Sequence, residues 1–336
     1  MNLDGLIRLE HGSGGALSRD LVESVIYPAF ASDAYPELSD ASPLSPGSEL
    51  LLTTDGYVVD PPFFPGGDIG KLCVFGTCND LAVCGARPLS LSLAVVVEEG
   101  FPIVQLERAL ASAAAAAMEA QTRVVTGDTK VVPQGKGGGL FLTTAGVGTR
   151  VFPHQLSPAR VRVGDAVIVS GPLGAHGITV MAARESLPVG NTLKSDAAFL
   201  YPLTSSLFPL GESLRFMRDA TRGGVAAVLN EAVHGARWGI EVDEDNFPVD
   251  QDVKAVSDLL GLNPLEIANE GVFVAVVAEQ AAEQALSALR SFARGKKAAL
   301  VGTVTSQNPS AVVMRTSIGG KRMMDFPRGL LLPRIC

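Results

Sequence analysis

The sequence predicts an α/β (α+β) protein of two domains. Alternating strand and helix signals run through both halves of the chain, which favours this architecture. The chain has 336 residues, about the length at which one hydrophobic core divides into two. The alternation breaks at Pro153 and Pro158, and a new strand-to-turn unit begins at Asp165. We therefore expect an N-terminal segment at 1–40, a first domain at 41–153, a second domain at 154–328 and a flexible tail at 329–336.

The individual elements follow from local signals. Asp68 can accept backbone N–H groups at the start of a helix, and Pro102 suits the first turn of another. The stretch 89–93 alternates leucine and serine, which predicts a strand with one apolar and one polar face. The polar face is either solvated or packed against a partner subunit. The expected elements of the first half are strands at 50–54, 89–97 and 140–148, a strand ending at 126, and helices at 68–83 and 102–120. Those of the second half are a helix at 223–233 and strands at 272–277 and 311–314.

Composition excludes several classes of function. The net charge is -8, with 35 acidic and 27 basic residues and no basic run, so a nucleic-acid partner is not expected. The first eight residues lack the basic and apolar regions of a signal peptide. The longest bland apolar stretch, 109–118, is shorter than the roughly 20 residues that span a bilayer. We expect a soluble, cytoplasmic protein without a membrane partner.

The four cysteines fall into two groups. Cys73, Cys78 and Cys84 have four and five residues between them, which matches neither a Cys-x-x-Cys zinc site nor the common iron–sulfur spacings. We expect them to be small, reduced core residues. Cys336 ends the sequence, where an extended tail of roughly seven residues could carry its sulfur about 20–25 Å. Such a thiol is either an inert terminal residue or an arm that moves between sites.

Four aspartates stand at turn-like positions, and three of them are candidate ligands for Mg²⁺. They are Asp55, Asp80, Asp128 and Asp219. Each one alone could be a cap or turn residue. Mg²⁺ prefers a few carboxylates together with phosphate oxygens, and strand ends of one sheet could bring Asp55, Asp80 and Asp128 together. The three would then form a nucleotide site.

Glycine-rich turns could supply the backbone N–H groups that bind phosphate. The candidates are His11–Gly15, with Gly12 and Gly14, and the turn Gly135–Gly139. Neither matches the P-loop or the dinucleotide fingerprint, so ATP would bind in another fold.

Three further side chains could carry chemistry. Lys130 could neutralise a transferring phosphoryl group, although a lysine beside an aspartate is commonly a surface charge. Glu270 precedes a buried-looking strand and is either a general base or a strand-end turn residue. His176 lies in a glycine-rich turn, where a histidine often only satisfies backbone groups.

Six stretches together form a specific pattern. They are His11-Gly12-Ser13-Gly14-Gly15, Asp60 to Lys71, Gly127 to Val132, Asp219 to Gly224, Asn269-Glu270-Gly271 and Pro333-Arg334-Ile335-Cys336. With them the chain resembles the HypE carbamoyl dehydratases of nickel–iron hydrogenase maturation, in the superfamily of aminoimidazole ribonucleotide synthetase and selenophosphate synthetase. One departure is Ala175, where the family often has Asp before His-Gly.

The resemblance implies a two-domain PurM-like fold, with an ATP-binding first domain that pairs its sheet in a homodimer. It implies that Cys336 carries a carbamoyl group, attached by the carbamoyltransferase HypF, and that ATP-dependent dehydration turns this group into a thiocyanate. The cyanide would then pass to iron on a HypC–HypD complex. Cys336, Lys130 and Glu270 would be catalytic, and Asp55, Asp80 and Asp128 would hold Mg²⁺. The expected ATP-binding residues are Asp55, Asn79, Asp80, Gly127, Asp128, Thr129, Gly12, Gly14, Asp219 and Arg222.

Two alternatives stay open at this point. A selenophosphate synthetase-like enzyme would keep the ATP site, but such enzymes carry a reactive Cys or selenocysteine with Lys near the N-terminal glycine loop. Here that stretch is Ser13-Gly14-Gly15-Ala16. A non-enzymatic thiol carrier would present Cys336 to partners without turnover.

Overall fold

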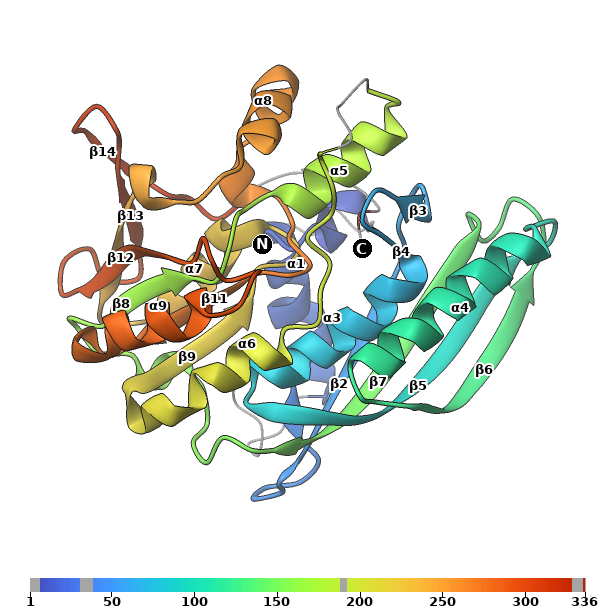
Figure 1. The fold of residues 1–336 in the computed structure, drawn as a ribbon, viewed down its shortest axis with the longest axis horizontal. Helices are drawn as coiled ribbons and strands as arrows, with labels where there is room; N and C mark the ends of the chain where they lie inside the picture. Colours follow the sequence, from blue (N-terminus) through green and yellow to red (C-terminus); the bar gives the residue numbers. More distant parts are fainter. Residues whose placement is uncertain (1–6, 31–38, 188–191, 328–334, 336) are drawn as a thin grey trace.

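The computed structural model describes residues 7–30, 39–187, 192–327 and 335, which form two α/β halves side by side (Figure 1). Each half is built on a sheet, as the alternating sequence pattern predicts. An N-terminal helical segment precedes the first sheet; it consists of α1 (Ala16–Leu21), a π-helical stretch (Val22–Ile26) and α2 (Tyr27–Phe30). Of the predicted tail at 329–336, only Ile335 lies within the described residues.

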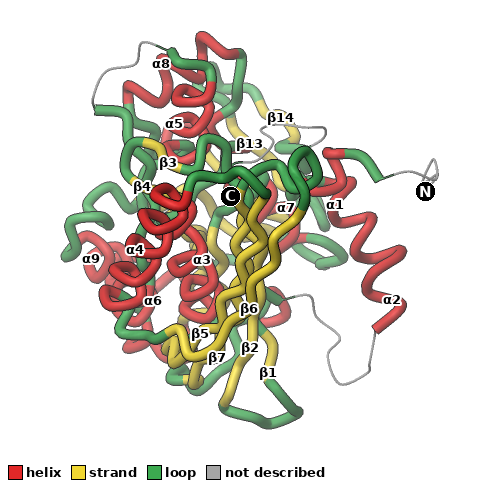
Figure 2. The backbone as a smooth tube through the Cα atoms, turned by 90° about the vertical axis from the view of Figure 1, so that its right-hand side faces the viewer, coloured by secondary structure: helices red, strands yellow, loops and turns green. Residues whose placement is uncertain are grey.

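The first sheet has five strands in the order β1-β2-β7-β5-β6. They are β1 (Ser42–Pro43), β2 (Leu50–Tyr57), β7 (Leu140–Arg150), β5 (Ala86–Glu98) and β6 (Val124–Val132). The helices α3 (Ile69–Val83) and α4 (Ile103–Glu119) lie on one side of this sheet (Figure 2). The Asp68 carboxylate accepts the backbone N–H groups of Gly70 and Lys71 at 2.8 and 3.0 Å, which confirms the predicted start of α3.

Two strands are longer than their sequence signals indicate. The prediction that a strand ends at Thr126 is wrong, because β6 continues to Val132 and carries Asp128 and Lys130 within it. Parallel pairing with β5 explains the extension, since Asp128 lies opposite Ala94 in the ladder and each partner satisfies the other's backbone groups. Likewise β2 continues past Thr54 through Asp55, so neither aspartate sits in a turn.

The second sheet has seven strands in the order β14-β13-β10-β12-β8-β11-β9. They are β14 (Lys321–Met323), β13 (Val312–Arg315), β10 (Gly239–Asp243), β12 (Ala299–Thr305), β8 (Ala166–Val169), β11 (Phe273–Val277) and β9 (Leu214–Asp219). The helices of this half are α5 (Ala175–Arg184), α6 (Tyr201–Ser206), α7 (Gly224–Val233), α8 (Gln251–Leu260) and α9 (Ala282–Arg290). A hairpin of β3 (Phe63–Phe64) and β4 (Gly67–Asp68) precedes α3.

Both halves contribute to one apolar cluster at their junction. It joins buried residues of α3 and the first sheet, such as Phe75 and Tyr57, to Ile178 of α5 and Ile267 of the second half. The buried Asn79 of α3 reinforces this junction, because its amide donates to the carbonyl of Ala198 and accepts from the N–H of Leu200. The two halves are therefore packed as one unit.

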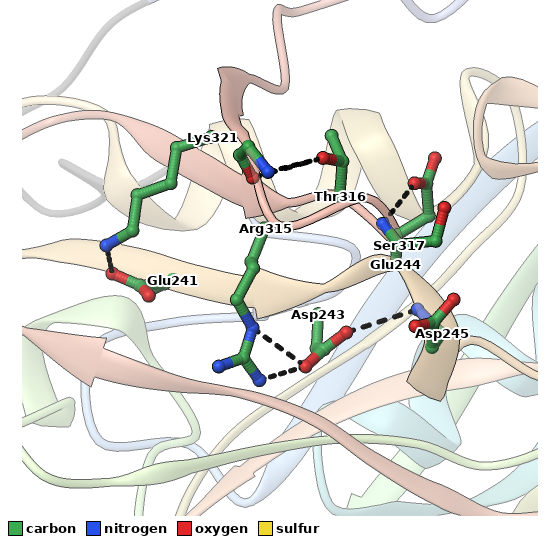
Figure 3. A network of polar contacts seen from close by, with 9 residues as sticks. Glu241, Asp243, Glu244, Asp245, Arg315, Thr316, Ser317 and Lys321 are labelled. Atoms are coloured by element: carbon green, nitrogen blue, oxygen red, sulfur yellow. Dashed lines mark hydrogen bonds and ion pairs between the residues drawn. The ribbon is translucent and has the colours of Figure 1, made fainter.

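Charged pairs hold the far edge of the second sheet. Arg315 donates to Asp243, Lys321 pairs with Glu241 at 2.8 Å, and the N–H of Ser317 donates to Glu244 (Figure 3). These contacts tie the β13–β14 hairpin to β10, at the edge opposite β9. Among the helices of the described ranges, none is long and apolar enough to cross a membrane.

Candidate active site

Carboxylates from both halves converge at the domain junction. Asp55 lies on β2, Asp80 near the end of α3, Asp219 at the end of β9, and Glu270 just before β11. Burial raises the pKa of Asp80 well above its ordinary range, and the charges of Asp55 and Asp219 add to this. Burial likewise raises the pKa of Asp219 and of Glu270, with Asp55 contributing to both. The fold thus brings Asp55, Asp80, Asp219 and Glu270 together, whereas the sequence pattern predicted convergence of Asp55, Asp80 and Asp128.

Hydroxyl groups orient two of these carboxylates. The Thr53 hydroxyl donates to Asp80 at 2.7 Å, while Thr77 and Tyr57 both donate to Asp55 at 3.2 Å. These hydroxyl donors orient the two carboxyl groups without adding a positive charge to the cluster.

Two arginines lie beside the cluster. Arg218 pairs with Asp40 at 2.9 Å and with Glu231 at 3.0 Å. The charge of Arg222 opposes the rise in the pKa of Glu270, and its guanidinium also donates to the carbonyl of Gly12. The sequence prediction missed Asp40, which carries no motif and enters the cluster through Arg218.

This donor set fits a divalent cation that arrives with phosphate. Within the described ranges, no three His, Cys, Asp or Glu side chains form a closed metal site of their own. Mg²⁺ usually takes one or two carboxylates plus waters and substrate phosphates, so a closed cage is not required. The carboxylate oxygens of Asp55 and Asp80 are hard ligands that match that preference.

Asp128 and Lys130 lie elsewhere in the single chain. They form an ion pair with each other, and their side chains are 63% and 66% exposed. The sheet register places Gly127 opposite Leu93, Leu93 opposite Thr144, and Thr144 opposite Asp55. Asp55 is therefore three strand spacings from β6, roughly 14 Å. One chain cannot bring Asp55 and Asp128 to a single Mg²⁺, and Thr129 and Gly127 share the position of Asp128.

The N-terminal glycine loop packs against the turn that contains Arg222. Gly14 has φ +77°, and a Cβ there would lie 2.5 Å from the Cβ of Arg222. Gly223 has φ +79°, and a Cβ there would lie 2.9 Å from the carbonyl oxygen of Gly14. These glycines allow the two loops to touch, which places Gly12 and Gly14 beside Arg222 as the sequence pattern suggests. The N–H of Gly14 donates to Ser18 at 2.9 Å.

Two other predicted phosphate or cofactor contacts are already used within the chain. The N–H groups of Gly135 and Gly139 donate to the carboxylate of Glu98, so this turn holds an internal anion. The amide of Asn79 is 1% exposed and binds backbone groups of the second half. Asn79 therefore acts as a structural clamp in this fold.

Two of the three internal cysteines are core residues, as the sequence predicts. Cys73 and Cys78 are buried in the core, and burial raises the pKa of both thiols, that of Cys78 to about 12. Cys84 is half-buried, and burial raises the pKa of its thiol to about 12. Cys336 lies outside the described residues, but its neighbour Ile335 is buried and bridges Val59, which follows β2.

Comparison with known proteins identifies the family. Residues 38–150 match the family described as AIR synthase related protein, N-terminal domain, and residues 162–315 match its C-terminal domain. The chain is 46% identical over 335 residues to the carbamoyl dehydratase HypE of Rhizobium leguminosarum bv. viciae, covering 99% of this chain and 96% of the relative. The chain belongs to the HypE family of carbamoyl dehydratases. The expectation of an enzyme is confirmed, and the non-enzymatic carrier loses its support.

Solved HypE structures have the same fold. The structure of a HypE–HypF complex gives a TM-score of 0.86 at 41% identity and covers 91% of this chain and 99% of the HypE chain. A HypE structure in complex with ATP gives 0.83 at 39% identity, covering 98% and 100%. These matches confirm the predicted PurM-like two-domain fold.

The HypE fold also reveals residues that sequence reasoning missed. The carboxylate of Asp196 accepts the N–H groups of Glu270 and Gly271 at 3.2 and 3.3 Å. Burial raises the pKa of Asp196 to about 6. Its partners lie more than 70 residues away in sequence, so no local signal points to it. His176, which the sequence places in a glycine-rich turn, is fully buried and contacts the carbonyl of Ile335.

Proposed function

We propose that this chain uses ATP to convert an S-carbamoyl group on Cys336 into an S-cyano group, the cyanide donor for the iron of nickel–iron hydrogenase. One observation supports this most directly: Ile335 lies at the junction where the carboxylate cluster assembles. It bridges Val59, four residues along the chain from Asp55, which is roughly 13 Å of strand. A carbamoylated cysteine side chain and a nucleotide triphosphate together can span that distance.

The chemistry requires an activated oxygen. The carbamoyl oxygen of R–S–C(=O)–NH2 attacks the γ-phosphorus of ATP, which gives R–S–C(=NH)–OPO3 and ADP with loss of one N–H proton. Loss of the second N–H proton then breaks the C–O bond and releases phosphate, leaving R–S–C≡N. Phosphate leaves where oxide could not, so ATP supplies the driving force.

The residues take the following roles. Asp55 and Asp80 would hold Mg²⁺, which supplies charge neutralisation for the phosphates. Glu270 accepts an N–H proton; burial and the charges of Asp219 and Asp196 raise its pKa, which makes its carboxylate a stronger proton acceptor. Gly12, Gly14 and Arg222 border the nucleotide beside Asp219.

A second copy of the chain would complete the site. Strand β6 is the edge of the first sheet, and eight of its nine residues are exposed, including Val125 and Val131 at 61% and 69%. Exposed apolar edge strands are rare in monomers because they invite pairing. Within one chain, the order of the sheet keeps Lys130 and Asp128 away from the carboxylate cluster. In the proposed homodimer, the partner subunit's Lys130 and Asp128 would reach that cluster.

The partners follow from the family. A relative has been solved as a HypE–HypF complex, and we propose that HypF loads the carbamoyl group onto Cys336. A HypC–HypD complex would receive the cyanide. In the proposed function, Cys336 would reach HypF, the nucleotide site and the HypC–HypD complex in turn.

Intact-mass measurement tests the proposal. Carbamoylated protein given Mg²⁺ and ATP should lose the mass of one water at Cys336 and form ADP and phosphate. Glu270→Gln should abolish this loss while nucleotide binding persists, whereas the nearby Glu266→Gln should behave as wild type. Full-rate dehydration by Glu270→Gln would contradict the assigned role, and no loss of water in the wild type would refute the function itself.

A further inference from the structure

His176 joins three distant parts of the chain. It lies in the first turn of α5 with no solvent exposure. Its Nε2 is 2.5 Å from the carbonyl oxygen of Ile335, and its Nδ1 is 2.9 Å from the Oγ of Ser195. The ring thus connects the domain junction to the residue that precedes Cys336.

The hydrogen-bond network fixes which nitrogen carries the proton. A carbonyl oxygen can only accept, so Nε2 of the neutral ring carries the proton and Nδ1 accepts from the Ser195 hydroxyl. The Oγ of Ser195 also accepts the N–H of Ala197 at 3.1 Å. Nε2–H donates to the carbonyl of Ile335.

The surroundings keep this ring neutral. Burial lowers the pKa of His176 to about 4. The ring packs edge-on against Phe64, with centroids 5.4 Å apart. A neutral donor makes a weaker hydrogen bond than an imidazolium would, so the contact with the tail is readily broken and remade.

Residues of both halves form the binding site for Ile335. Its backbone bridges Val59, its side chain is 6% exposed, and it belongs to the same apolar cluster as Phe64 and Ile178. This combination of backbone pairing and a side-chain pocket is the way extended peptides commonly bind to folded domains.

We propose that His176, oriented by Ser195, is a positioning residue that latches the carbonyl of Ile335 and thereby presents Cys336 to the carboxylate cluster. The role of Cys336 rests on the proposed function; the latch itself rests on these contacts. The turn that carries Ser195 continues into Asp196, which holds the N–H groups of Glu270 and Gly271. The segment 195–196 therefore positions both His176, which contacts the tail, and the backbone of the proposed base Glu270.

The test measures tail docking separately from catalysis. The rate at which iodoacetamide alkylates Cys336 in the full-length protein, followed by peptide mass mapping, reports the undocked fraction. Carbamoylated protein then gives the single-turnover dehydration rate and the KM for ATP. The variants are His176→Phe and Ser195→Ala, with His176→Gln and Ser195→Thr as controls that retain a donor.

His176→Phe should alkylate about fivefold faster, as expected for the loss of one neutral hydrogen bond, and should dehydrate more slowly with an unchanged KM for ATP. His176→Gln should restore the rates, because its amide N–H can replace Nε2–H. Ser195 is half-buried, so its substitution by alanine should be tolerated. Ser195→Ala therefore tests the latch if the Phe variant does not fold.

Wild-type alkylation rates in folded His176→Phe and Ser195→Ala proteins would overturn the latch. Faster alkylation in both variants supports the latch even if the wild type shows no dehydration; that second result would refute only the proposed function.

Discussion

Graded truncation of Ile335 should release the tail in proportion to the apolar surface removed. Ile335 is 6% exposed, so nearly all of its side chain is shielded from water in the docked state. Each buried methylene contributes about 0.8 kcal/mol. Ile335→Val removes one carbon and should cost about 0.8 kcal/mol of docking, whereas Ile335→Ala removes three and should cost about 2.4 kcal/mol.

These energies convert into measurable ratios. Since 1.4 kcal/mol is a factor of ten, the docking equilibrium should fall about fourfold in the Val variant and about fiftyfold in the Ala variant. Alkylation of Cys336 by iodoacetamide would follow the undocked fraction and rise until the tail is wholly free. Ile318→Ala is a matched control, because Ile318 is 93% exposed.

The order of the series is the critical result. Alkylation at the wild-type rate in Ile335→Ala, or a larger effect in Val than in Ala, would show that burial of this side chain does not hold the tail. The contacts of Ile335 with Val59 and His176 would then not be what holds the tail.

Three further predictions concern charge. Asp80→Asn should raise Tm at pH 7 by about 1–2 °C per kcal/mol of repulsion removed. A raised carboxyl pKa gives stability that is complete below the ordinary pKa and is lost as pH rises, so a Tm gain at pH 7 no larger than at pH 4 would contradict this prediction. Lys130→Ala should leave Tm nearly unchanged, because the exposed ion pair with Asp128 contributes little stability, but it should abolish dehydration. Lys136→Ala is the control, and retained activity in Lys130→Ala would refute the proposed role of Lys130. Glu98→Gln should speed hydrogen exchange at the amides of Gly135 and Gly139, and unchanged exchange would show that the carboxylate does not hold this turn.

Local signals sufficed where the physical cause is local. Asp68 caps α3 through residues two and three positions away, and Pro102 precedes α4, so both helix starts could be predicted within one residue. The extent of β6 could not, because a ladder with β5 maintains the strand through Asp128, and aspartate is uncommon in strands. Pairing with a distant segment overrides local preference in this case.

The candidate site was predictable in its composition and less so in its geometry. The residues Asp55, Asp80, Asp219 and Glu270 do converge, but the number of strands between Asp55 and Asp128 depends on sheet order, which the sequence does not display. The contact of His176 with Ile335 spans 159 residues, and that of Asp196 with Glu270 spans 74. The hydrophobic periodicity of a sequence does not indicate contacts between residues so far apart along the chain.

The shared apolar cluster at the junction has a consequence for how the molecule can move. Many nucleotide enzymes close two lobes around their ligand, but hinge bending of that kind would here pull Phe75 and Ile178 out of a common core and break the hydrogen bonds of Asn79 to Ala198 and Leu200. The shared core therefore opposes closure of the two halves. In the proposed function, the carbamoyl group would accordingly be delivered to a preformed acidic site, without domain closure around it.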